Sequence, residues 1–176
     1  QYYRFLTSGF IHSNTMHLLF NMIALFFFGG VIERIYMGLY GYAGIFFYLV
    51  TYLVGIIVSN LRTFFKYRDS IYYNSLGASG GVAAILFASI IYRPTSGICI
   101  YFAICIPAFI LGIVYLIYSY FSAKRSGDNI NHDAHLYGSL FGAIFTIILR
   151  PVVILEFIER IKNFDLYSFN FLSILF

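Results

Sequence analysis

The sequence predicts an all-α membrane protein, a polytopic bundle with five transmembrane helices. The chain is 61% hydrophobic and only 10% charged, whereas a soluble domain carries about 25% charged residues. The charges also leave long gaps, and a helix needs roughly 20 predominantly apolar residues to cross a bilayer. We therefore expect the lipid bilayer to surround the protein. The net charge of +4 is small and dispersed, so we expect no nucleic-acid partner.

The gaps between charged residues predict the individual helices. Four gaps are long enough for one span each, with 28 residues after Arg4, 27 after Arg34, 23 after Asp69 and 30 after Arg93. The fifth gap has 16 residues, and it completes a span only if the arginine at its end snorkels and 151–155 join the helix. The predicted helices lie near 16–32, 42–59, 77–93, 98–121 and 134–150.

The chain is predicted to be a single domain over residues 1–176, because its loops are short and it contains no internal repeat. The tail, residues 151–176, begins by mixing apolar and charged residues, which is typical of a helix lying at the membrane interface. Cys99 and Cys105 lie in an apolar run, and we expect them to be small core residues and not a disulfide framework. Positive charges divide six against five between the two sides, so they do not decide the orientation.

Polar residues inside membrane helices are costly and are therefore candidates for function. The first, third and fifth predicted helices enter the membrane from the same side. His17 and Asn21 lie near the start of the first helix, Ser79 near the start of the third and His135 near the start of the fifth. This parity predicts that all four side chains lie in one layer, a few residues below one surface.

Small residues offer a way to bring Ser79 close to His135. Gly138 and Gly142 form a small-xxx-small pattern, which lets another backbone approach closely, and the run 77–81 is equally bare. Packing of these two surfaces would place a serine hydroxyl beside a neutral imidazole that can take its proton.

The remaining polar residues of the layer suit the stabilisation of an oxyanion. His17 and Asn21 are four residues apart and share a helix face. Their N–H groups, with the backbone N–H of Ser79 at a helix N-terminus, could bind a developing negative charge. Asp133 would face away from His135 on a helix, so a Ser–His dyad is predicted and not a triad.

Other interpretations of these residues stay open. A serine in a membrane helix is usually a packing residue. The run 77–81 also fits the nucleophile elbow of soluble α/β-hydrolases, but that motif needs a parallel sheet, which the composition excludes. A zinc site is conceivable, but no cysteine or carboxylate joins the histidines at metal-ligand spacing. We therefore predict neither a metal nor a cofactor for the four histidines His12, His17, His132 and His135.

Together, these motifs resemble the rhomboid family of intramembrane serine proteases. The match covers nearly the whole chain in the right order and spacing. The stretches that carry it are His12–Asn21, Gly77–Gly80 and Ala134–Gly142, with Gly29-x-x-x-Glu33 and Tyr3-Arg4 as further family features.

The resemblance implies a serine endopeptidase that cleaves single-span transmembrane proteins within or next to the bilayer. Ser79 would be the nucleophile and His135 the general base, with His17, Asn21 and the backbone of Ser79 in the oxyanion site. Structural and packing roles would fall to Gly77, Gly80, Gly138, Gly142, Arg4 and Glu33.

The resemblance also implies a multi-pass protein with its active site near the extracytoplasmic face of a plasma or inner membrane. The chain would hold the second to sixth helices of a six-helix core, without the first. Residues 1–15 would be the end of a membrane-embedded loop that Arg4 packs in place. The stretch 98–121, with Pro107 at midspan, would be the mobile gate for substrate. Some bacterial members stack a tyrosine on the catalytic histidine from four residues after the serine, where this chain has Ala83.

Two other functions fit parts of the sequence. An inactive rhomboid-like protein would bind membrane proteins and assist their turnover, but it would need neither Ser79 nor His135. A small membrane transporter would spread its polar groups through the membrane depth, whereas here they are predicted to lie in one outer layer.

Overall fold

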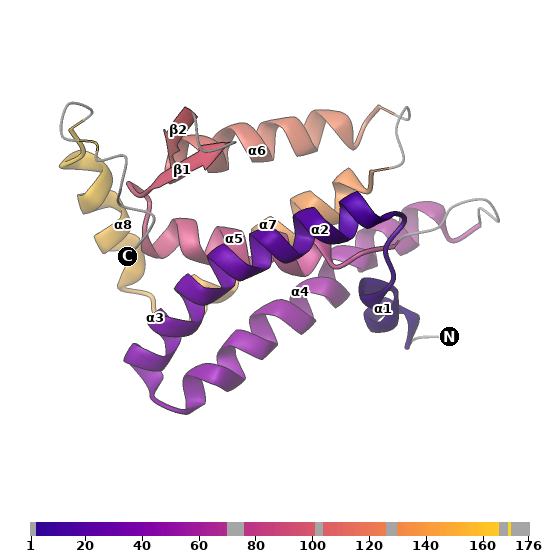
Figure 1. The fold of residues 1–176 in the computed structure, drawn as a ribbon, viewed down its shortest axis with the longest axis horizontal. Coiled ribbons are helices and arrows are strands. Elements are labelled where there is room, and N and C mark those ends of the chain that lie inside the picture. The colour runs from indigo at the N-terminus through magenta and orange to yellow at the C-terminus, as the bar shows by residue number, and fades with distance from the viewer. Residues whose placement is uncertain (1–2, 70–75, 101–103, 126–129, 166–168, 170–176) are drawn as a thin grey trace.

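The computed structural model describes residues 3–69, 76–100, 104–125, 130–165 and 169, and it is mainly helical (Figure 1). The elements in chain order are α1 (Arg4–Thr7), η1 (Ser8–Phe10), α2 (Thr15–Ala24), η2 (Leu25–Gly29), α3 (Gly30–Tyr40), α4 (Ala43–Tyr67), α5 (Ser79–Tyr92), β1 (Gly97–Ile100), β2 (Ile104–Pro107), α6 (Ala108–Ser122), α7 (His132–Leu149) and α8 (Val153–Lys162).

Among the residues that the structure describes, two helices are long and apolar enough to cross a membrane. The first is Thr15–Tyr40, which joins α2, η2 and α3, and the second is α4. A third span results if α7 and α8 are counted together, whereas α5 and α6 are apolar but shorter. An apolar helix therefore lies in each of the five predicted stretches, but the count of five spans is not confirmed.

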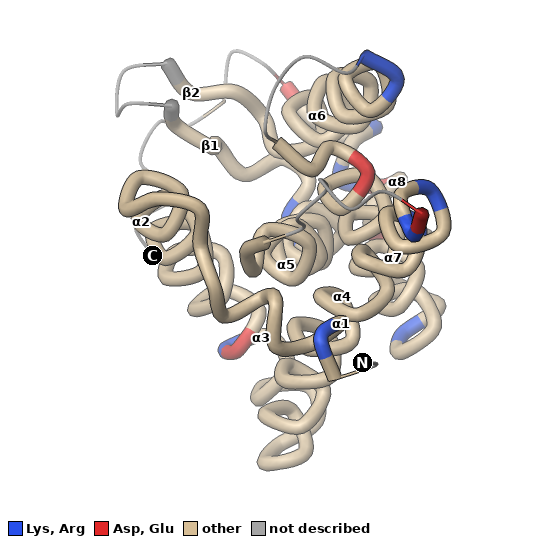
Figure 2. Tube along the Cα trace, turned by 90° about the vertical axis from the view of Figure 1, so that its right-hand side faces the viewer, with Lys and Arg blue, Asp and Glu red and all other residues tan. Residues whose placement is uncertain are grey.

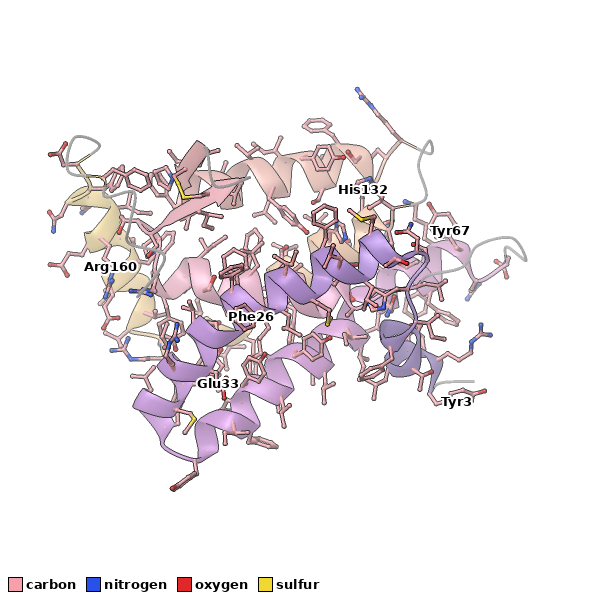
Figure 3. The ribbon with its side chains drawn as sticks, in the orientation of Figure 1. Tyr3, Phe26, Glu33, Tyr67, His132 and Arg160 are labelled. Atoms are coloured by element: carbon pink, nitrogen blue, oxygen red, sulfur yellow. A yellow bond between two sulfur atoms is a disulfide. The ribbon has the colours of Figure 1, made fainter. Side chains whose placement is uncertain are left out.

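The prediction of one helix over 98–121 is wrong in its first part. β1 and β2 form an antiparallel hairpin, and α6 begins only at Ala108. Pro107 directly precedes the helix, where proline is tolerated, instead of kinking a helix at midspan. The hairpin places Cys99 opposite Cys105, and a disulfide joins them (Figure 3). The expectation of two separate core cysteines is therefore wrong, and the fold includes a small sheet that an all-α class lacks.

The fifth predicted span does not continue through 151–155. The chain turns by 111° between α7 and α8, and α8 crosses the end of the bundle (Figure 1). Arg150 donates two hydrogen bonds of 2.6 Å to the carboxylate of Glu156, and this contact holds the pKa of Glu156 below its ordinary value. Val153 is buried against the core. An interfacial location of the tail stays a prediction, and its residues 166–168 and 170–176 lie outside the described residues.

α5 is the central helix, and nearly all of its residues are buried. Glycines allow its neighbours to approach its backbone. Gly138 and Gly142 of α7 lie directly against the backbone of Gly80 and Ala84 in α5, and Gly55 of α4 also lies against Ala84. Gly138 faces Gly80 and Gly142 faces Ala84, so the two contacts are four residues apart on both helices, and α5 and α7 pack in parallel with their starts at the same end.

A buried hydroxyl group links the long helices around α5. The hydroxyl oxygen of Tyr36 lies 3.4 Å from Oγ1 of both Thr51 and Thr146, which joins α3, α4 and α7. Each threonine hydroxyl also donates to a carbonyl of its own helix at 2.8 Å. This polar group is therefore satisfied inside an otherwise apolar core, as burial requires.

The outer surface is largely apolar, as a lipid-facing surface should be. Phe26 is 77% exposed, and α6 presents Ile113, Val114 and Ile117 outward. Figure 2 shows the charged residues mainly at helix ends and in connections, with none on α5. Apolar exposure on this scale would favour association in water, so the fold is that of a membrane protein.

A methyl group added at Gly138 should destabilise the fold, because it would meet the backbone of Gly80. We expect Gly138→Ala to lower the free energy of unfolding by about 1–3 kcal/mol. The matched control is Gly38→Ala in α3, where an added Cβ has open space and should stabilise by about 0.5–1 kcal/mol. Thermal unfolding in detergent micelles checks both, and equal effects would contradict the close packing.

Candidate active site

The start of α2 carries the first two polar residues of the predicted layer. Asn14 caps the helix by accepting a 2.8 Å hydrogen bond from the backbone N–H of His17. Oγ of Ser13 lies 3.1 Å from Nδ1 of the His17 ring, which fixes the imidazole. Asn21, one turn further, is only 6% exposed, and its Nδ2 has no hydrogen-bond partner among the described residues. Because an unsatisfied buried amide is costly, this group is well suited to donate to a ligand.

The turn before α5 packs on the imidazole of His17. Gly77 has φ +109°, which side chains other than glycine rarely tolerate, and a Cβ there would lie 2.8 Å from Nε2 of His17. Its N–H donates to the carbonyl of Ser8 at 3.0 Å. Ser79 follows as the first residue of α5, where the backbone N–H groups lack partners within the helix. The structure thus brings the α2 histidine next to the segment that carries Ser79.

The start of α7 lies beside the same segment. His135 is in the first turn of α7, and Gly138 lies three residues later against the backbone of Gly80. A Cβ on Gly80 would also be 3.4 Å from the carbonyl oxygen of Ala134. The residues next to Ser79 and His135 therefore lie close together. A hydrogen bond between these two side chains stays a prediction.

Two rings contact the imidazole of His135, and the sequence pattern predicts neither contact. The ring of Tyr115, from α6, stacks on it with centroids 6.0 Å apart and an interplanar angle of 28°. His132 meets the same imidazole edge-on at 5.9 Å. No sequence signal marks Tyr115. The sequence predicts a helix over 98–121 but does not show which of its faces points toward His135.

Asp133, for which the sequence predicts no role, is paired with Lys66 of α4. Nζ of Lys66 lies 2.7 Å from Oδ2 of Asp133 and donates to the carbonyl of Ala123 at 2.8 Å. Nearby, Thr63 donates to Oδ1 of Asn131, the cap of α7. The end of α4 thereby holds the start of α7, two residues before His135.

Two residues expected to pack the fold are exposed. Arg4 lies on the surface of α1 and Glu33 on the surface of α3. α1 contacts α4 through Phe5, whose ring meets Phe64 edge-on at 5.2 Å and whose carbonyl accepts a hydrogen bond from Asn60. The described residues contain no cluster of three or more His, Cys, Asp or Glu that could hold a metal.

The fold and the site describe a helical membrane protein with a serine, histidines and an asparagine at one end of its helices. The sequence model of the Rhomboid domain matches residues 1–152, and the chain belongs to the rhomboid family. RHOMBOID-like protein 12, mitochondrial, of Arabidopsis thaliana is 33% identical over 147 residues, which cover 79% of this chain and 44% of that protein. The chain thus spans less than half of this relative's length. No solved structure matches the chain significantly.

The contact between Lys66 and Asp133 should contribute to stability, because the Asp133 side chain is only 11% exposed. We expect Lys66→Met to lower the free energy of unfolding by about 1–2 kcal/mol, and the double variant with Asp133→Asn to cost less than the sum of the single changes. The control is Arg68→Met, whose pair with Asp69 is 3.5 Å long and largely exposed and should contribute little. Additive effects in a thermal-unfolding cycle would contradict the coupling.

Proposed function

We propose that the protein is a serine endopeptidase that hydrolyses peptide bonds of transmembrane proteins within or next to the bilayer. The observation that carries this proposal is the close packing of Gly138 against the backbone of Gly80, which brings the starts of α5 and α7 together. Membership of the rhomboid family supports it, as does the position of His17 against Gly77.

The chemistry requires a nucleophile and a base. Oγ of Ser79 would attack the carbonyl carbon of the scissile bond while the imidazole of His135 takes the hydroxyl proton. The same imidazole would then give this proton to the leaving amine. Water would hydrolyse the resulting acyl-enzyme by the same base catalysis and regenerate Ser79. No step in this sequence requires a cofactor.

The oxyanion of the tetrahedral intermediate would be bound by donors from two helices. If the Ser13 hydroxyl donates to Nδ1 of His17, the ring proton sits on Nε2, which lies on the ring edge that faces Gly77. Nδ2 of Asn21 and the backbone N–H of Ser79 would supply the other donors. Such donors act most strongly where water is excluded, and Asn21 is buried.

The proposed location is a multi-pass position in a membrane, with the site near the extracytoplasmic face. The Arabidopsis relative is mitochondrial by name, which supports a mitochondrial membrane over a plasma membrane. The substrates would be single-span membrane proteins. A site at the start of α5 and α7 would lie near one membrane surface, where it would meet the end of a substrate's spanning helix.

Covalent labelling tests the nucleophile. In detergent, a serine-directed fluorophosphonate should label the purified full-length protein, and Ser79→Ala should abolish the labelling. His135→Ala should slow it by at least about 10³-fold, because the hydroxyl loses its base. The matched control is Ser89→Ala on the same helix, whose hydroxyl donates to the carbonyl of Leu86 and should not react.

Two outcomes of this experiment overturn the assignment. Labelling that survives Ser79→Ala would show that another residue reacts. Absence of labelling in the unmodified protein, together with intact binding of a single-span protein, would support the inactive rhomboid-like alternative.

Substitution of the oxyanion donors should affect turnover more than binding. We expect His17→Ala and Asn21→Ala each to lower kcat by about 10²–10³-fold, since the donors act on charge that develops in the transition state. Cleavage of a fluorogenic single-span peptide in proteoliposomes measures kcat and KM separately. Met22→Ala, on the exposed face of α2, is the control, and a change in KM alone would contradict the oxyanion role.

A further inference from the structure

The aromatic ring that stacks on His135 comes from a helix at the edge of the bundle. Tyr115 lies on α6, and its ring is nearly parallel to the imidazole, at 28°. A parallel ring on one face restricts how far the imidazole can rotate about its χ2 angle, which is otherwise broad. The orientation of the proposed base is therefore coupled to a residue outside α2, α5 and α7.

Tyr115 is itself held from α5. The centroid of the Phe87 ring lies 5.7 Å from that of Tyr115, so Tyr115 is placed between α5 and His135. Phe87 is buried and belongs to the same apolar cluster as Ile90 and Ala108, against which Tyr115 packs. This arrangement transmits the position of α6 relative to α5 directly to the imidazole.

A second pair of rings repeats the contact one turn away. Tyr118 of α6 meets His132 of α7 edge-on at 5.4 Å, and Figure 3 shows His132 at the start of α7. Both pairs are three residues apart on their helices, so they lie on matching faces. Two tyrosines of α6 thus contact two histidines of α7, next to the proposed base.

At the centre of α6, a glycine packs against apolar side chains of α5. Gly112 lies one turn before Tyr115, and a Cβ there would be 3.2 Å from the side chain of Ile90. The outward face of the helix is exposed at Ile113 and Val114. Added bulk at Gly112 would therefore push the middle of α6 away from α5 while its exposed face is unaffected.

We propose that Tyr115 is a positioning residue for His135, and that the seating of α6 against α5 decides whether the base is in place. A helix displaced outward would withdraw the stacked ring and remove one restraint on the rotation of the imidazole, while its edge-on contact with His132 stays. The proposal rests on the proposed proteolytic function, which it deepens by making one edge helix a control element of catalysis. The ring that stacks on the proposed base comes from Tyr115 of α6. Position 83 on α5 holds an alanine and offers no ring.

Kinetics of Ser79 labelling test the positioning role without requiring a substrate helix to enter. In the full-length protein, Tyr115→Leu should lower the labelling rate about 3- to 10-fold, the loss expected for one aromatic pair. Tyr115→Phe keeps the ring and should stay within about twofold of the unmodified protein. The matched control is Tyr120→Leu, which removes an exposed ring from the same helix.

A second pair of variants tests the seating of α6 with Tyr115 intact. Gly112→Leu should reproduce the slow labelling of Tyr115→Leu, because it displaces the helix that carries the ring. Ile113→Phe adds bulk on the exposed face and should have no effect. If Gly112→Leu labels at the normal rate, control through the seating of α6 is overturned.

A spectroscopic readout separates this proposal from the proposed function. The imidazole protons of His135, identified by their absence in His135→Gln, should show an upfield ring-current shift that Tyr115→Phe keeps and Tyr115→Leu loses. If this shift responds as expected while Ser79 is never labelled, the stacking stands and proteolysis fails. If Ser79 is labelled equally fast in Tyr115→Leu, proteolysis stands and the positioning role is overturned.

Discussion

The close approach of α5 to α4 and α7 is the contact on which the rest of the structure depends. It is possible only because glycine occupies positions such as Gly55, Gly138 and Gly142, where any Cβ would meet a neighbouring side chain or backbone. Surrounded in this way, α5 does not need the length of a lipid-facing span, because protein covers it on most sides. The first turn of α5 consequently lies inside the bundle. Its backbone N–H groups lack partners within the helix, so they need other polar groups beside them.

Much of the helical part of the fold could be predicted, because charged residues are so costly in lipid that their gaps outline the helices. The wrong predictions concern features that the cost of charge in lipid does not determine. Glu33 and Arg34 did not end the first helix, since both lie on its exposed side. The hairpin before α6 was missed because an apolar stretch of alternating β-branched residues reads the same in a strand as in a helix. The turn after Arg150 is bridged by its hydrogen bonds to Glu156, a pairing that hydropathy does not register.

The candidate site could be predicted in its polar members but not in its supports. Parity alone places His17, Ser79 and His135 at the same end of their helices. Tyr115 could not be found in this way, since the rotation of α6 depends on what α5 offers to pack against. Lys66 and Asp133 are 67 residues apart, and no local pattern links them. Groups that do chemistry are conspicuous in an apolar sequence, whereas groups that orient them look like ordinary packing.

The length of α4 beyond its contact with α5 has a consequence for any molecule that reaches the site. Ser59 lies against Gly80, and α4 continues from there to Tyr67, a distance of about 12 Å at 1.5 Å per residue. A peptide bond at that depth lies within the end of a substrate's own helix, where its carbonyl is already hydrogen-bonded. Under the proposed function, cleavage would be selective for segments that unwind readily over about two turns. The mechanical stability of the target helix, and not only its side chains, would determine which membrane proteins are cut.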